Sequence, residues 1–151
     1  MKLRSKVDSV LSKTLIVIMS VMVLNVLWQV FTRYVVGDPS SFTDELARFL
    51  MIWSGVLGAA YVSGQNMHVS IDLIPSRSSE KNRILLKKIV NILIIAFALF
   101  ALLIGGSRLV YISHILGQHS AALQIPLAPV YAVLPLSGLL IIYYKISDLK
   151  S

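Results

Sequence analysis

The chain alternates long apolar stretches with short polar connections. Three stretches, 14–32, 49–67 and 89–107, contain no Asp, Glu, Lys or Arg, and residues 109–144 are again free of these charges. A helix needs about 20 apolar residues to cross a hydrocarbon core of about 30 Å, so each of the first three stretches predicts one membrane span. The last stretch is too long for one span, and its polar part, 113–120, predicts the connection before a fourth helix. The predicted spans are about 14–36, 45–65, 88–112 and 126–145.

This alternation predicts an all-α membrane protein, with four transmembrane helices joined by short loops in a single domain over residues 1–151. The composition agrees, with 56% hydrophobic and 14% charged residues, whereas soluble domains carry about 25% charged residues. The basic N-terminus and the apolar stretch behind it resemble a signal peptide. That stretch is longer than the usual apolar core of about 7–15 residues, and no small-residue cleavage motif follows it, so we expect a retained first helix.

The basic residues fall almost entirely on one side of this topology. Eleven of the fourteen Lys and Arg residues lie before residue 14, around 77–88 or in the C-terminal tail. The positive-inside rule therefore places both termini in the cytoplasm and residues 37–44 and 113–125 outside. The net charge of +7 follows the topology rather than one soluble face, so we do not expect nucleic-acid binding.

Four polar residues interrupt the apolar pattern of the first helix. Asn25, Gln29, Thr32 and Arg33 follow one another at helical spacing and form one stripe. A polar side chain in lipid marks a buried face or an interface. The stripe either packs against the other helices of the chain through interhelical hydrogen bonds or faces a partner subunit.

Charged residues gather at the predicted outer ends of the first two helices. Glu45 and Arg48 are three residues apart on one helix face, and the short outer loop can bring Arg33 close to Asp44 and Glu45. Acids at a helix N-terminus are favoured by the helix dipole. We expect an ion-pair cluster that ties the helix ends together, and the same cluster is a candidate docking surface on the outer face.

Small residues and prolines predict local packing and bending. The pairs Ser54/Gly58 and Gly55/Ala59 on the second helix are spaced for close intramolecular helix packing. In the fourth helix, Pro135 is interior and leaves the carbonyl of the residue four positions earlier without its helical donor, which predicts a bend.

The chain carries little that points to chemistry of its own. No Asp or Glu lies in the middle of a predicted span, although proton-coupled pumps generally need an intramembrane carboxylate. The chain has no cysteine, and its histidines fall on opposite sides of the membrane, His68 inside and His114 and His119 outside, so they cannot share a haem iron. We expect no enzyme activity, metal or cofactor.

An ordered set of residues resembles the small membrane subunit of tripartite ATP-independent periplasmic (TRAP) transporters. The resemblance covers residues of about 25–135 and is specific mainly as an ordered set on a four-span chain. It rests on the following pieces: Gln29-Val-Phe-Thr-Arg33-Tyr34, Pro39, Asp44-Glu45-Leu-Ala-Arg48, Trp53, Leu57-Gly-Ala-Ala60, His68, Asp72, Ser120-Ala-Ala-Leu-Gln-Ile-Pro126, Tyr131 and Pro135.

The resemblance implies a role within a three-part machine. In that family a periplasmic binding protein captures an organic anion, and a large multi-span membrane subunit moves it inward with sodium. The resemblance implies that this chain is a scaffold in the bilayer, bound to the large subunit, with outer loops that contact the binding protein. Sialic acids, dicarboxylates and other carboxylates all remain open as solutes.

Two other functions are compatible with four apolar spans. A self-assembling small channel or transporter would need several copies and a polar lumen, for which the stripe from Asn25 to Arg33 is the candidate. A haem- or quinone-binding subunit of a membrane enzyme would need converging ligands.

Overall fold

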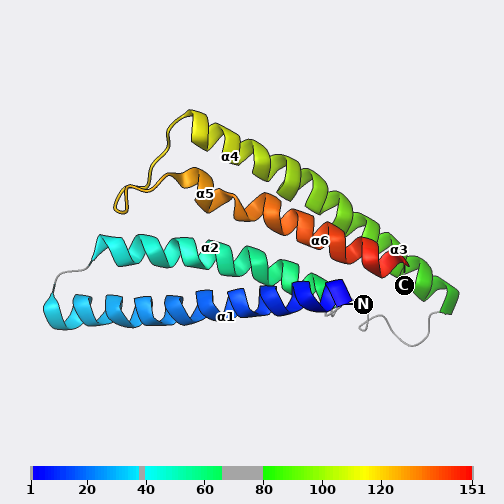
Figure 1. Ribbon diagram of the computed structural model, residues 1–151, viewed down its shortest axis with the longest axis horizontal. Coiled ribbons are helices and arrows are strands. Elements are labelled where there is room, and N and C mark those ends of the chain that lie inside the picture. Colours follow the sequence, from blue (N-terminus) through cyan, green and yellow to red (C-terminus); the bar gives the residue numbers. More distant parts are fainter. Residues whose placement is uncertain (1, 38–39, 66–79, 151) are drawn as a thin grey trace.

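Within the described residues, four long helical rods run up and down the molecule (Figure 1). The computed structural model describes residues 2–37, 40–65 and 80–150, and within these residues it contains helices and no β-strand. The elements are α1 (Lys2–Phe31), the π-helical η1 (Thr32–Val36), α2 (Ser41–Gly64), α3 (Glu80–Phe97), the π-helical η2 (Ala98–Gly105), α4 (Gly106–Ile115), α5 (Leu127–Tyr131) and α6 (Val133–Lys150).

Each rod is long and apolar enough to cross a bilayer, which confirms the predicted all-α, four-helix fold. The first and third rods begin earlier than the predicted spans, because charged residues end an apolar stretch without ending a helix. Lys, Arg and Glu are good helix formers, so the helices continue past the apolar segments. The four candidate spans are Arg4–Val36, Ser41–Gly64, Leu85–Ile115 and Leu127–Leu149.

The rods form two antiparallel pairs that meet through α2 and α6. One pair is α1 with α2, and the other is α3, η2 and α4 with α5 and α6. Both termini, the end of α2 and the start of α3 lie together at one end of the molecule, here named the terminus end (Figure 1). The end of η1, the start of α2 and the loop between α4 and α5 lie at the opposite end, here named the loop end.

The buried core follows the line where α2 and α6 meet. Glycine permits close approach on two sides of α6. Towards η2, a Cβ on Gly138 of α6 would lie 3.0 Å from Leu102 Cβ and 3.2 Å from the Ala98 carbonyl oxygen. Gly64 of α2 is packed against the ring of Tyr144 in the same way. The cluster of buried apolar residues consists of Leu11, Leu57, Ala60, Ala98, Val133, Ile141 and Tyr144.

The small-residue pairs predicted to pack within the chain do not do so. A Cβ on Gly55 or Gly58 would meet no atom within 4 Å, and Gly55 and Ala59 are exposed. That prediction is wrong because small-residue spacing identifies a helix face that permits close packing without identifying its neighbour. The helix crossings place α6 against a different face of α2, the one that holds Ala60 and Gly64.

The fourth rod is interrupted rather than gently bent. Ala132 separates α5 from α6, and its N–H lies 3.1 Å from the Ala128 carbonyl oxygen and 3.2 Å from that of Pro129. Pro135 has no N–H to offer the carbonyl of Tyr131, where α5 ends. The sequence therefore removes one helical hydrogen bond at the point where α5 ends and α6 begins.

Candidate functional site

The loop end is organised by one carboxylate that receives three backbone amides. Glu45, in the first turns of α2, accepts from the N–H of Ala121 at 3.1 Å, of Ala122 at 2.9 Å and of Leu123 at 2.7 Å. Hydrogen bonds to an ionised acceptor are stronger than neutral ones. This arrangement, the Glu45 clamp, ties the α4–α5 loop to the start of α2 and so joins the two helix pairs.

The loop presents these amides because it closes on itself. The Ser120 N–H donates to the Ile125 carbonyl at 2.9 Å, and the Leu127 N–H donates to the Gln118 carbonyl at 2.9 Å. Gln124 takes a positive φ of 55°, which turns the chain tightly between these bonds. Three successive N–H groups, 121–123, are left at the tip, where Glu45 meets them.

One ion pair of the expected cluster stands beside the clamp. Arg48 Nη2 lies 2.9 Å from Asp44 Oδ2, four residues earlier on α2, and this pair is well exposed. Glu45 faces the loop on another side of the helix and forms no salt bridge within the described residues. Asp44 also accepts a hydrogen bond from Gln29 Nε2 at 3.0 Å, which links α1 to α2.

The polar stripe of α1 and η1 lies against α2 over part of its length. Asn25 is buried and its Nδ2 donates to the Thr43 carbonyl at 2.7 Å. Thr32 is also buried, and its hydroxyl donates to the Gln29 carbonyl of its own helix at 3.0 Å. The stripe thus makes contacts of the intramolecular kind, between the two helices of one pair.

Arg33 lies beside Asp44 without forming a salt bridge in the part of the chain that the structure describes. Its guanidinium stands 6.0 Å from the centre of the Tyr34 ring. A hollow of about 330 Å³ separates the groups, lined by Gln29, Arg33, Ser40, Ser41 and Asp44. The loop end therefore displays exposed cationic and anionic groups side by side.

The loop also anchors on α2 through an aromatic residue. Trp53 Nε1 donates to the Val130 carbonyl of α5 at 3.1 Å, just before the interruption that accompanies Pro135. His114 and His119 are exposed at this end, and His68 lies outside the described residues. Within residues 2–37, 40–65 and 80–150, no three His, Cys, Asp or Glu side chains gather into a metal-binding group.

A second polar cluster, at the terminus end, was not predicted. Arg4 Nη1 lies 2.8 Å from Asp148 Oδ1, and its Nη2 donates to the Gly64 carbonyl. The Tyr144 hydroxyl donates to Asp8 Oδ1. These contacts, here named the terminus clamp, join α1, α2 and α6.

The terminus clamp also holds a buried cation. Lys145 is 1% exposed, and its ammonium lies 3.5 Å from Asp148. A buried charge needs a partner, and Asp148 supplies it while also binding Arg4. The available signal was the presence of two acids, Asp8 and Asp148, within otherwise basic chain ends.

Comparison with known proteins matches most of the chain to one family. The family model described as "Tripartite ATP-independent periplasmic transporters, DctQ component" covers residues 22–151. The sialic acid TRAP transporter small permease protein SiaQ of Vibrio cholerae is 28% identical over 82 residues, 54% of this chain and 47% of that protein. A Haemophilus influenzae protein with the provisional name of TRAP transporter small permease protein is 30% identical over 78 residues, 52% of this chain and 48% of that protein. Each alignment therefore spans about half of the relative's length.

Proposed function

This chain belongs to the DctQ-component family of the tripartite ATP-independent periplasmic transporters, and we propose that it is a membrane scaffold bound to a larger, multi-span transport subunit. The observation that carries the proposal is the contrast between firmly tied ends and an open apolar surface. The Glu45 clamp and the terminus clamp close the two ends of the bundle. Only 6% of the most apolar window of the first span is buried within the chain.

A scaffold of this kind would enlarge the fixed part of a transporter. A transport domain that slides through the bilayer needs a partner that does not deform with it, and a bundle tied at both ends resists deformation. The large apolar side chains left exposed along α1 and α3 would meet lipid or the large subunit. Those more than 60% exposed on these two helices are Leu24, Val10, Leu93, Ile16, Leu27, Phe97 and Val17.

The proposed orientation has both termini in the cytoplasm of a bacterium and the loop end outside. Of the thirteen basic residues within the described ranges, ten lie at or near the terminus end, which supports this orientation through the positive-inside rule. The exposed Arg48–Asp44 pair and Arg33 would then face the periplasm, where a soluble binding protein can contact them. The solute we propose is an organic anion with a carboxylate group, taken up with sodium.

The test is affinity purification of the chain, tagged at its C-terminus, from the cells that naturally produce it. In mild detergent a large multi-span membrane protein should copurify in stoichiometric amount. A homo-oligomer without any larger partner would refute the scaffold role and favour a self-assembled channel.

Charge reversal tests the outer surface separately. Arg48→Glu should weaken solute uptake in cells, because it breaks the exposed Arg48–Asp44 pair that is proposed to face the binding protein. It should not change which solutes are taken up, because a surface pair of this kind does not contact the solute. Lys88→Glu, the same charge reversal at an exposed position of α3 at the terminus end, is the matched control and should leave uptake unchanged. Altered solute selectivity in Arg48→Glu would contradict a purely structural role.

A further inference from the structure

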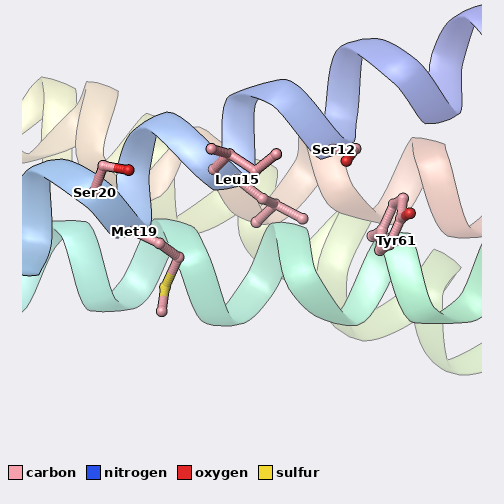
Figure 2. Close-up of a pocket in the computed structure, with 6 residues that line it drawn as sticks. Ser12, Leu15, Met19, Ser20 and Tyr61 are labelled. Carbon is pink, nitrogen blue, oxygen red and sulfur yellow. The ribbon is translucent and has the colours of Figure 1, made fainter.

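A groove runs along the first helix pair near the terminus end (Figure 2). It has a volume of about 400 Å³ and opens sideways between α1 and α2, away from α6. Figure 2 shows Ser12 and Tyr61 near one end and Met19 and Ser20 near the other, with Leu15 between them. The groove, here named the α1 groove, is lined by Ser12, Leu15, Ile16, Met19, Ser20 and Tyr61.

The length of the groove along the helix axis matches the thickness of one leaflet of a bilayer. Lys13 immediately precedes the charge-free stretch 14–32, so Ser12 and Lys13 sit at headgroup level when that stretch fills the hydrocarbon core. From Ser12 to Ser20 the helix rises by about 12 Å, at 1.5 Å per residue. Half of a hydrocarbon core is about 15 Å. The groove therefore begins at the membrane surface and ends near the midplane.

The mouth of the groove continues into a basic, hydroxyl-bearing strip on α1. A Ser-Lys pair occurs at Ser5-Lys6 and again at Ser12-Lys13, and a spacing of seven residues places both pairs on one side of a helix. Lys6 and Lys13 are exposed, and neither forms a salt bridge within the residues described by the structure. The Lys13 ammonium thus lies at the level of the lipid phosphates. Lys6 lies about 10.5 Å further out along the helix axis, from where its long side chain can reach back toward the same headgroup.

We propose that the α1 groove binds one phospholipid with an anionic headgroup, whose phosphate meets Lys6 and Lys13 while one acyl chain lies between α1 and α2. The two lysine charges match the anionic headgroup, and the apolar lining from Leu15 to Met19 matches the acyl chain of the lipid. A transmembrane helix of a partner would pack along the whole span, whereas this groove stops near the midplane. Only the choice of leaflet, the cytoplasmic one, rests on the proposed orientation.

The proposal is tested on the purified full chain by native mass spectrometry in mild detergent. Phosphatidylglycerol and phosphatidylcholine with identical acyl chains are titrated separately. Phosphatidylglycerol should be retained more strongly, and Lys6→Gln with Lys13→Gln should weaken its binding by about 30-fold, from about 1 kcal/mol for each lysine near an anionic surface and tenfold for each 1.4 kcal/mol.

Two control variants separate a built site from general attraction to charge or surface. Lys87→Gln with Lys88→Gln removes the same charge from exposed positions on α3 and should leave binding unchanged. Ser20→Phe fills the apolar end of the groove and should weaken the binding of both lipids. Val17→Phe adds the same bulk to a 61% exposed position outside the groove and should have no effect.

Three outcomes would overturn the proposal. Equal retention of the two lipids, or an equal loss from the α3 lysine variant, would show nonspecific association. A photo-crosslinking residue at Ile16 should capture lipid in cells, and capture of a large polypeptide instead would assign the groove to a protein partner. Because the mass measurement uses this chain alone, its failure leaves the scaffold proposal untouched, and failed copurification leaves the lipid site untouched.

Discussion

Replacing Gly64 by alanine places a methyl group inside the ring of Tyr144. The new Cβ would lie 2.7 Å from Cε1 and Cζ of that ring and 2.9 Å from Cδ1. The ring cannot turn away freely, because it is fully buried, its hydroxyl is bonded to Asp8, and the Arg4 guanidinium stands 5.6 Å from its centre. The methyl group must therefore push α2 and α6 apart or break the terminus clamp.

The expected loss of stability follows from two opposing effects. Overpacking a well-filled core costs about 1–3 kcal/mol, while alanine gains about 0.5–1 kcal/mol over glycine in a helix. The net destabilisation should be about 1–2 kcal/mol, which corresponds to a fall in Tm of about 2–8 °C for a chain of this length. To measure this fall, the detergent-solubilised chain is heated to a series of temperatures. Size-exclusion chromatography then gives the fraction that is still folded at each temperature.

The same helix supplies the control. Gly58→Ala adds the same methyl group where no atom lies within 4 Å, so Tm should stay constant or rise slightly. In a chain that already carries Tyr144→Leu, the further change Gly64→Ala should destabilise the protein much less, because the stability changes caused by substitutions at contacting residues are not additive. If Gly64→Ala and Gly58→Ala shift Tm equally, or the cost persists without the ring, the close contact does not limit stability.

Two further predictions concern the loop end. Glu45→Gln removes the charge that receives the amides of 121–123, so these amides should exchange with solvent faster, whereas Arg48→Gln should leave their exchange unchanged; equal exchange rates in both variants would refute the clamp. Asn25→Ala should destabilise the chain by about 0.6 kcal/mol, the average for an interhelical hydrogen bond in a membrane, because the Thr43 carbonyl loses its donor; chemical unfolding in mixed micelles measures the loss, and an unchanged midpoint would contradict it.

The four spans could be predicted because the thickness of a bilayer determines how many apolar residues a helix needs. The contacting side of α1 could also be predicted, since Asn25 and Gln29 are polar and share one helix face, but the sequence left open whether this side meets the same chain or a partner subunit. In both cases the information lies in neighbouring residues along the chain, and helical periodicity converts it directly into structure.

The partner of a given side chain could not be predicted where it depends on tertiary arrangement. Glu45 binds backbone amides, which every residue carries, so no residue type at 121–123 marks them as its partners. Gly58 and Gly64 are both glycines on α2, and only the crossing of α2 with α6 decides which of the two is enclosed. The link between Arg4 and Asp148 spans 144 residues, far beyond any local pattern.

The terminus clamp constrains the order of events during synthesis. Its α1 residues, Arg4 and Asp8, are translated 136 to 144 residues before their partners Tyr144 and Asp148. At about 5–20 residues per second, this delay lasts roughly 7 to 30 seconds. During that time Arg4 and Asp8 lack these partners, and the α1–α2 hairpin is held by its own contacts, such as that of Asn25 with the Thr43 carbonyl. A nascent chain released before α6 is made would thus leave a hairpin in which Arg4 and Asp8 lack these partners. These unpaired charges are a feature that a quality-control protease can recognise.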